Sequence, residues 1–359
     1  MILEIAVFFG VLALLVLAHE FGHFIVARSR GVRVEEFGFG FPPRLFGFQK
    51  GGTFYSFNLL PLGGFVKISG ENDSASSDPK NFSSHSLQAR AAILSAGVIF
   101  NIILAFIIFS SAVYIGLPID ASTPLLTAKT GGNEITVVEV LPQSAAESAG
   151  IAAGDKILSL ESETGEKIIP SSISDIQAFT KNHLSQKIAV EIERGKKSKT
   201  LSAILSSSAV SPLGVAMTEI GIISAPWYKI PLVGLELTVS ALWGTIKGLF
   251  FIIGLIFSGA SVAGLVSGPV GIFSVVSGSL VFGLPVLMSL VAILSLNLAI
   301  INLMPIPGLD GGRLLFLVFE AARGKPVGQK VSGLAHTAGF AILIVLMAVI
   351  TYLDIRSKL

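Results

Sequence analysis

The chain has 359 residues, of which 52% are hydrophobic and only 13% are charged, and its mean hydropathy is +0.79. A soluble protein carries about twice that charged fraction, so the composition excludes an ordinary soluble protein and indicates a polytopic membrane protein. The net charge of +2 does not suggest nucleic-acid binding, and the absence of cysteine excludes disulfides, thiolate zinc sites and cysteine nucleophiles. Any zinc ion must therefore be bound by histidine, aspartate or glutamate.

The first apolar segment, residues 5–27, contains the sequence His19-Glu20-Phe21-Gly22-His23. On a helix, His19 and His23 lie one turn apart on one face and can bind one metal ion, with Glu20 beside them to handle the proton of a water. Ionisable groups inside a membrane are costly and usually functional. The alternative is a helix end whose polar groups reach the headgroups, but buried polar groups need partners, which favours the metal site.

The loop from Arg28 to Arg90 carries eight Lys and Arg against five Asp and Glu residues, which predicts a cytoplasmic location. Within it, residues 54–68 are rich in aromatic and β-branched side chains and are interrupted by Pro61 and a Gly-Gly pair, which predicts a β-hairpin. Unpaired strand backbone cannot face lipid. The hairpin is therefore either a small soluble element or a strand edge near the metal site that pairs with an extended substrate.

A second span is predicted over residues 91–117, in which Asn101 is either a helix contact or part of the site. The composition then turns soluble, and the pattern predicts a small α+β domain. The expected elements are a strand at 135–140, a short helix, a strand ending at 158, a helix at 175–184 and a hairpin of 187–193 with 198–205. His183 is expected to be a surface histidine, because no second type of ligand clusters with it.

Residues 248–309 contain no charged side chain, which is enough for two or three spans, and a last span is predicted at 331–353. If residues 240–258 crossed the membrane fully, the span that precedes Asp310 would end on the side of the membrane opposite the histidines. We therefore expect that segment to be interfacial or reentrant, giving about four spans with both termini outside. The expected divisions are residues 1–117 and 279–359 for the two halves of the membrane core, 118–223 for the soluble domain and 224–278 for the interfacial segment.

Asp310 is the best candidate for a third metal ligand, since catalytic zinc usually has three protein ligands and a water. It is the first charged residue after the neutral stretch, and residues 305–308, Pro-Ile-Pro-Gly, can lay irregular backbone into a polar cavity. The alternative is that Asp310 only begins a cytoplasmic loop with Arg313. His336 has no motif around it and is expected to be packed or interfacial, with a role in supporting the metal site as the lesser alternative.

Four motifs occur in order along the chain: His-Glu-Phe-Gly-His at 19–23, Pro-Leu-Gly-Gly-Phe-Val-Lys at 61–67, Gly-Pro-Val-Gly-Ile at 268–272 and Asn-Leu-Met-Pro-Ile-Pro-Gly-Leu-Asp-Gly-Gly at 302–312. Together they cover nearly the whole chain and resemble the site-2 family of intramembrane zinc metalloproteases, in its bacterial RseP-like branch. One departure is Gly97-Val98, where relatives often carry Gly-Pro. Another is the single soluble domain, since the best-known members have two PDZ domains.

The resemblance implies that one Zn²⁺ is bound by His19, His23 and Asp310, with Glu20 as general base and acid. It also implies that two asparagines near the site hold the substrate or the oxyanion, and that the 54–68 hairpin is a membrane-reentrant β-element that receives the substrate as a strand. The residues implied in substrate binding are Asn297, Asn302, Gly63, Gly64 and Phe65.

Residues 149–158, Ala-Gly-Ile-Ala-Ala-Gly-Asp-Lys-Ile-Leu, resemble the signature of bacterial PDZ domains. Residues 211–215, Ser-Pro-Leu-Gly-Val, resemble the ligand loop of these domains, placed last in the chain as in the permuted bacterial type. The resemblance implies that Leu213, Gly214 and Val215 hold the C-terminus of a peptide ligand.

The implied function is regulated intramembrane proteolysis in the bacterial cytoplasmic (inner) membrane, with the PDZ domain outside the cytoplasm. The expected substrates are transmembrane segments of single-span proteins already cut by another protease, such as anti-sigma-factor-like regulators or signal-peptide remnants. The expected surroundings are a lipid bilayer and no nucleic acid. Two alternatives are a catalytically silent scaffold that binds partners through its PDZ domain and a metal transporter, which usually shows internal repeats that this chain lacks.

Overall fold

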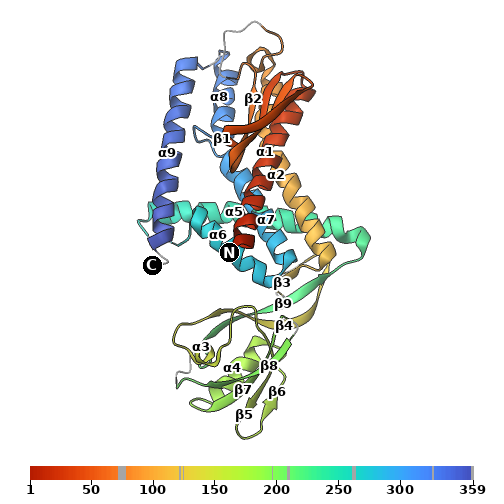
Figure 1. Ribbon diagram of the computed structural model, residues 1–359, viewed down its shortest axis with the longest axis vertical. Helices are drawn as coiled ribbons and strands as arrows, with labels where there is room; N and C mark the ends of the chain where they lie inside the picture. The colour runs from red at the N-terminus through yellow and green to blue at the C-terminus, as the bar shows by residue number, and fades with distance from the viewer. Residues whose placement is uncertain are drawn as a thin grey trace. The chain divides into compact units, whose positions relative to one another are not determined.

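The computed structural model describes residues 1–71, 78–120, 123, 125–195, 197–207, 211–260, 264–325 and 327–356. The chain forms two compact units, which are traced in Figure 1. Unit 1 comprises residues 1–111, 237–280 and 287–359, and unit 2 comprises residues 112–236 with 281–286.

Long apolar helices build most of unit 1. Five helices in the described residues are long and apolar enough to cross a membrane, so the protein is a multi-pass membrane protein. They are α1 (Ile2–Ser29), α2 (Leu87–Ile115), α5 (Ile230–Phe257), α7 (Leu284–Leu303) and α9 (Gln329–Arg356). The shorter helices α6 (Pro269–Ser279) and α8 (Asp310–Arg323) complete the unit.

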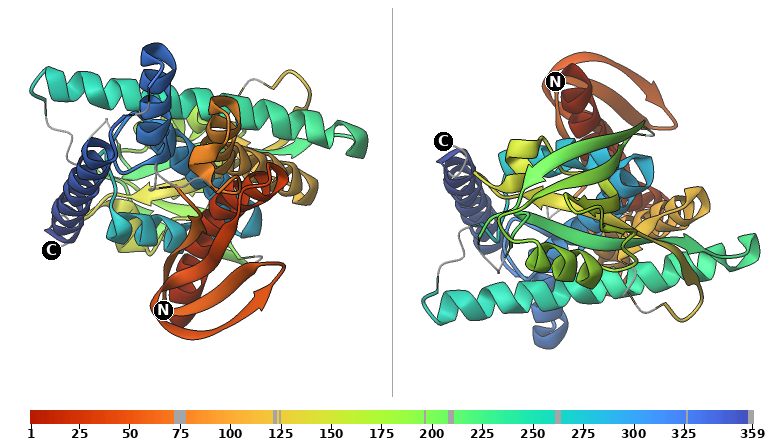
Figure 2. Two further views of the ribbon diagram at one scale, coloured as in Figure 1. Left: turned by 90° about the horizontal axis from the view of Figure 1, so that it is seen from above. Right: turned by 90° about the horizontal axis from the view of Figure 1, so that it is seen from below.

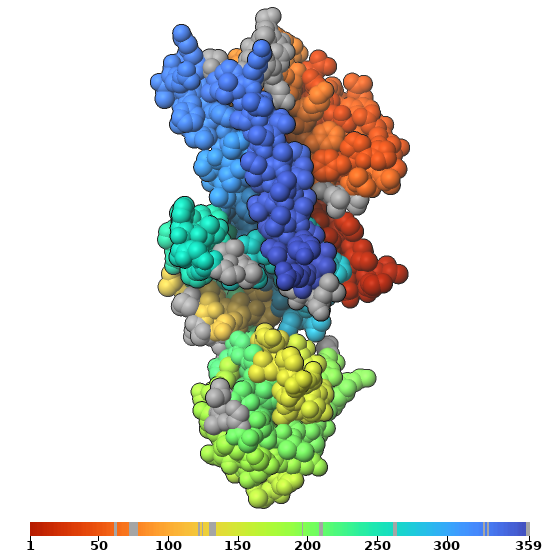
Figure 3. Space-filling view, turned by 90° about the vertical axis from the view of Figure 1, so that its left-hand side faces the viewer, coloured from red at the N-terminus to blue at the C-terminus, as the bar shows by residue number. Residues whose placement is uncertain are grey.

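The five long helices are not equivalent in direction or in packing. In Figure 1, α5 runs crosswise to α1, α2 and α9, and Figure 2 shows it extended along one side of the bundle. The apolar stretch of α2 is 44% buried, whereas that of α9 is only 6% buried and lies on the surface (Figure 3). Surface this apolar requires lipid around it. Length and composition therefore give five candidate spans, of which one is oriented differently from its neighbours.

The β-element of unit 1 differs from the predicted hairpin within residues 54–68. These residues belong to one long strand, β2 (Thr53–Ile68), which pairs with β1 (Val34–Lys50) across a turn at Gly51 and Gly52. Both glycines have positive φ, 59° and 81°, as a tight turn requires. The prediction was wrong because it looked for the partner inside 54–68, although the alternating phenylalanines of β1 were visible in the sequence.

The two strands curl into a sheet to which each strand contributes two paired segments. Residues 36–39 pair with 54–57 and also with 64–67, while 46–49 pair with 54–57. The order across the sheet is therefore 64–68, 34–39, 53–58 and 44–50. Pro61 and the Gly63-Gly64 pair lie where β2 passes from one side of residues 34–39 to the other. The segment 64–68 is an edge of this sheet and packs along α1, so one strand edge lies beside the histidine helix.

Unit 2 is an antiparallel α+β structure with strand order β3-β9-β4-β5-β7-β8 and β6 paired to β5. It contains the strands and helices expected from the sequence and adds β3, β6 and β9. The elements are β3 (Pro118–Asp120), β4 (Lys129–Val140), α3 (Ala145–Ala149), β5 (Lys156–Ser162), β6 (Lys167–Ile168), α4 (Ile173–Asn182), β7 (Lys187–Arg194), β8 (Lys197–Ile204) and β9 (Val215–Ser224). Its apolar core includes Leu160, Val190 and Phe179.

The expectation that His183 lies on the surface is wrong. The residue caps the C-terminal end of α4 and its side chain is 7% exposed. Its Nδ1–H donates to the carbonyl of Phe179 at 2.8 Å, and Nε2 lies 3.3 Å from a carboxylate oxygen of Glu166. Because both ring nitrogens have partners, burial of the imidazole costs little.

Candidate metal centre

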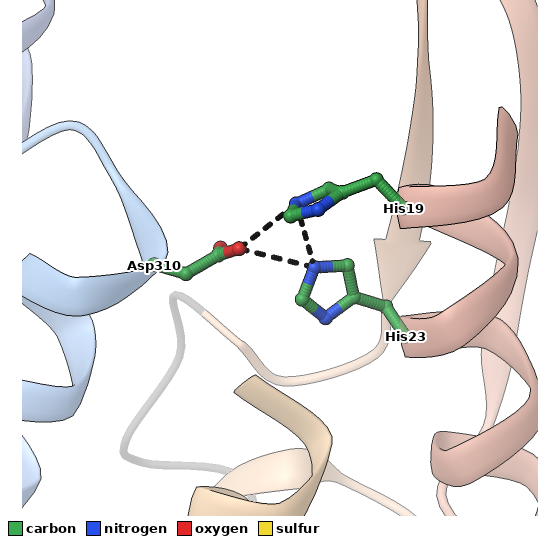
Figure 4. A group of neighbouring side chains, drawn as sticks. All are labelled: His19, His23 and Asp310. Carbon is green, nitrogen blue, oxygen red and sulfur yellow. Dashed lines mark hydrogen bonds and ion pairs between the residues drawn. The ribbon is translucent and has the colours of Figure 1, made fainter. Parts of the chain in front are cut away.

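Two histidines of α1 form one side of the site. His19 and His23 lie four residues apart on the same face of the helix, and both residues are buried, with 6% and 7% of their surface exposed. Their rings meet edge to face at 4.8 Å between centroids. Figure 4 shows both rings directed toward the carboxylate of Asp310, which approaches from α8.

The three ligand atoms have the spacing that one zinc ion requires. Oδ2 of Asp310 lies 3.0 Å from Nε2 of His19 and 3.2 Å from Nε2 of His23, and the two Nε2 atoms are 3.2 Å apart. A tetrahedral ion with bonds of about 2.0–2.1 Å separates its ligand atoms by about 3.3 Å. The donor set of two imidazoles and one carboxylate, with room for a water, therefore fits a catalytic zinc site.

The Asp-Gly-Gly sequence at the start of α8 holds Asp310 in place. A Cβ atom on Gly311 would lie 2.2 Å from the carbonyl oxygen of Met304, and one on Gly312 would lie 2.3 Å from that of Ile306. Only glycine permits this close return of the chain after α7, which brings the first residue of α8 up to the histidines. Asp310 therefore does more than begin a loop.

The electrostatics of Asp310 also suit a ligand. Burial favours its neutral form, but the hydrogen bonds with His19 and His23 outweigh burial and hold the pKa of this carboxyl well below its ordinary value. The group is therefore a carboxylate near neutral pH, which is the form that binds a metal.

Glu20 lies next to the ligands and against the sheet. Its carboxyl group is hydrogen-bonded to the backbone of Val66, in the edge segment 64–68. A cavity of about 230 Å³ opens at this point. Its lining comprises His19, Glu20, His23, Phe65, Val66, Ile68, Glu71, Leu94, Gly308, Leu309, Asp310 and Arg313. A carboxylate, three ligand groups and a strand edge thus share one polar cavity within an apolar unit.

Of the residues expected to bind substrate, some lie at the cavity and others lie away from it. Phe65 lines the cavity, and a Cβ on Gly64 would lie 3.5 Å from Cγ of Glu20, so the chain passes close to the carboxylate there. Gly63 packs against the ring of Phe41. Nδ2 of Asn302 lies 3.4 Å from Nε2 of His19, so this asparagine reaches the site.

Asn297 instead has its recorded partner on α5, where the hydroxyl of Thr245 donates to Oδ1 at 3.1 Å. Leu213, Gly214 and Val215 belong to unit 2. Leu213 is 3% exposed, and Gly214, with φ 76°, lies so close to Ser144 that a Cβ there would approach the serine Cβ to 2.3 Å.

The structure also gives partners to three residues beside the cluster. Arg313 and Glu71 line the cavity and form an ion pair with each other. Nδ1 of His336 accepts a hydrogen bond from the backbone N–H of Gly308 at 2.9 Å, so this histidine holds the loop before Asp310 and is not one of the clustered ligands. The ion pair had no signal in the sequence beyond charge beside an apolar segment, whereas a supporting role for His336 was the lesser alternative considered there.

Comparison with known proteins agrees with this geometry. The family model described as "Peptidase family M50" matches residues 7–346. A relative from Rhizobium meliloti, provisionally named a zinc metalloprotease, is 32% identical, and the alignment covers 98% of this chain and 96% of the relative. The zinc metalloproteases RasP of Shouchella clausii and Geobacillus kaustophilus are 27% and 28% identical, and each alignment covers 98% of this chain and 98% or 97% of the relative. The resemblance to the site-2 proteases is thereby confirmed, and the chain belongs to peptidase family M50.

Proposed function

We propose that the protein is an intramembrane zinc endopeptidase that cuts transmembrane segments of single-span membrane proteins. Membership of a peptidase family and relatives named as zinc metalloproteases support the enzyme class. The observation that carries the proposal is the cluster of His19, His23 and Asp310 beside Glu20, built on a helix apolar enough to span the bilayer. The test is cleavage of a single-span reporter by purified protein. A zinc-loaded protein that cleaves no such reporter would favour the scaffold alternative.

The chemistry divides between the metal and this chain's own groups. Zinc, when held by His19, His23 and Asp310, supplies Lewis-acid activation of water and of the scissile carbonyl. Glu20 takes the proton of the attacking water and passes it to the leaving amine. Asn302, whose amide lies 3.4 Å from Nε2 of His19, donates a hydrogen bond to the oxygen on which charge develops.

The strand edge explains how a helical substrate presents a peptide bond. The carbonyls of a transmembrane helix are used in its own hydrogen bonds, so the helix must unwind before it is cut. The segment 64–68 is an edge of the curled sheet and lines the same cavity as Glu20. We propose that the unwound segment pairs with this edge, which offsets the lost helical bonds.

For unit 2 we propose a PDZ-like role in choosing substrates. Strand β9 pairs with β4 along 215–224 and with β3 only at 220–222, so within the described residues no strand pairs with its second edge at 215–219. Helix α4 begins beside this edge, where the N–H of Ile173 donates to Glu219. A strand edge next to a helix suits an extended peptide end, such as the new C-terminus left by an earlier cut.

Replacing residues 118–224 by a flexible linker should change which proteins are cut and leave zinc content unaltered. The metal ligands all belong to unit 1, and a short linker suffices because Pro118 pairs with Ile222. The measurement is zinc per chain together with cleavage of paired reporters, with and without a bulky extracytoplasmic domain. Loss of zinc in the shortened protein would show that unit 2 is needed for the core to fold and would contradict a filtering role.

We propose that the protein lies in the bacterial inner membrane with four spans, the fifth long helix, α5, lying in the interface. Its direction relative to α1 and α9 supports this arrangement. So do its charges, since Glu236 and Lys247 are both on α5, and the Lys247 ammonium lies 5.6 Å from the ring of Trp243, a pairing suited to the headgroup region. Unit 2 then lies outside the cytoplasm.

Single cysteines introduced at Ser224 and Ser258, which flank α5, should react with a membrane-impermeant maleimide from the same, outer side. Both serines are exposed, and the chain has no cysteine of its own to react. A third variant, Ser29→Cys, is the control, since it lies at the cytoplasmic end of α1 and should react only after the membrane is permeabilised. Labelling of positions 224 and 258 from opposite sides would show that α5 spans.

A further inference from the structure

One face of α2 supports both histidine ligands. Ile93, Gly97 and Asn101 follow one another at intervals of four residues, so they form a stripe along one side of the helix. The carbonyl of Ile93 accepts a hydrogen bond from Nδ1–H of His23 at 2.8 Å. The side-chain amide of Asn101 lies against Nδ1 of His19, with 3.4 Å between the two nitrogens.

Gly97, in the middle of this stripe, lets the two rings lie against the helix. A Cβ atom there would be 2.4 Å from Nε2 of His23 and 2.5 Å from Cε1 of His19. Real Cβ atoms do not approach other atoms so closely. Any side chain at this position would therefore push the imidazoles away from Asp310. The present position of the two rings requires glycine at residue 97.

The outer nitrogens of the two rings need hydrogen-bond acceptors. Both Nε2 atoms face Asp310, so a metal ion bound there leaves each ring proton on Nδ1. His23 donates this proton to the carbonyl of Ile93. The group facing Nδ1 of His19 is the side-chain amide of Asn101, whose oxygen is an acceptor. Which end of an amide is oxygen and which is nitrogen is assigned from the hydrogen-bond partners around it.

Asn101 is suited to this role because nothing else holds its amide. The residue is 0% exposed, and among the described residues its Oδ1 has no hydrogen-bond partner. A buried amide oxygen without a donor is costly. Turning the amide so that the oxygen faces Nδ1–H of His19 gives the oxygen a donor. The backbone of Asn101 is fixed separately, since its carbonyl accepts from the hydroxyl of Ser295 at 2.8 Å.

We propose that Asn101 is a positioning residue for the metal site, which accepts the Nδ1 proton of His19 and so presents Nε2 to the ion, and that Gly97 is the surface on which both rings rest. The inference depends on His19 and His23 being zinc ligands, as in the proposed function. It assigns to the middle of α2 a task in metal binding beyond helix packing.

Replacing Asn101 with leucine should lower zinc affinity about 10–100-fold, the usual cost of losing a partner of a ligand histidine. Leucine fills a similar volume and brings no polar atom into this buried position, so the fold should persist. Affinity is measured for the purified full-length protein by competition with a zinc chelator, and the visible spectrum of the Co²⁺-loaded protein reports ligand geometry. Asn101→Asp, which keeps an acceptor at the same place, should restore both affinity and spectrum.

Ser295→Ala is the matched control, because it removes a buried hydrogen bond to the same residue without touching His19; its zinc affinity should equal that of the wild type. Gly97→Ala should lose zinc more severely than Asn101→Leu. If Asn101→Leu does not fold, Asn101→Ala gives the same comparison. A folded Leu or Ala variant with wild-type affinity and an unchanged Co²⁺ spectrum would overturn the inference. A wild-type protein that binds no zinc would instead overturn the proposed function.

Discussion

Replacing Glu20 with glutamine is expected to stop turnover while the zinc stays bound. Glutamine has nearly the same size but cannot take up the proton of the attacking water. The three ligand groups, from His19, His23 and Asp310, are unchanged by this substitution. Loss of a general base typically costs a factor of ~10²–10⁴ in rate. The measurement is zinc per chain by elemental analysis beside cleavage of a single-span reporter, and uncut substrate should copurify with the variant.

Glu4→Gln is the matched control, since it makes the same chemical change on the same helix, in the first turn of α1. It should cleave at the wild-type rate. If Glu20→Gln also cleaves at that rate, another group moves the proton and the proposed mechanism is wrong. If Glu20→Gln loses its zinc, the carboxylate contributes to binding the metal and the division of roles between Glu20 and the ligands must be revised.

Removing a ligand should have a different signature, in which metal and activity are lost together. Asp310→Ala or His23→Ala deletes one of three donor atoms that lie within 4.8 Å of one another. Binding energy for the metal depends on the number of deprotonated ligands that the fold brings together. We expect zinc content to fall to below about one tenth of an ion per chain, because removal of one ligand weakens metal binding strongly. Zinc and cleavage are measured as for Glu20→Gln.

His85→Ala provides the control for histidine loss in general. The ring of His85 contacts the backbone carbonyls of Asn81 and Arg30, away from the cluster, so zinc and activity should stay at the wild-type level. An Asp310→Ala protein that is fully loaded with zinc would remove Asp310 from the ligand set. The hydrogen bond of His336 to Gly308 makes that histidine the next residue to examine.

Local spacing predicted that His19 and His23 lie on one face, because the geometry of a helix is fixed. The interval between His19 and His23 is one turn, and this relation does not depend on the rest of the fold. Asp310 was chosen because a catalytic zinc usually has a third protein ligand, and because this carboxylate follows a long neutral stretch and an irregular Pro-Ile-Pro-Gly segment. The structure brings these residues together as expected.

Features that depend on contacts distant in the sequence were predicted less well. The partner of residues 54–68 is the preceding segment 34–50, and periodicity within one strand does not identify its neighbour. His183 was expected on the surface because its partners, a backbone carbonyl and Glu166, leave no pattern in the sequence. The same holds for Gly97, whose role depends on two rings that another helix presents.

The metal ligands come from nearly opposite ends of the chain, and this separation has a consequence for the timing of biosynthesis. His23 and Asp310 are 287 residues apart. At a translation rate of about 5–20 residues per second, roughly 15–60 seconds pass between the synthesis of the two ligands. During that interval the nascent chain already contains Glu20 and residues 64–68 but lacks a complete donor set. The site is therefore incomplete, and the protease inactive, until the segment that carries Asp310 has been synthesised and has reached the two histidines.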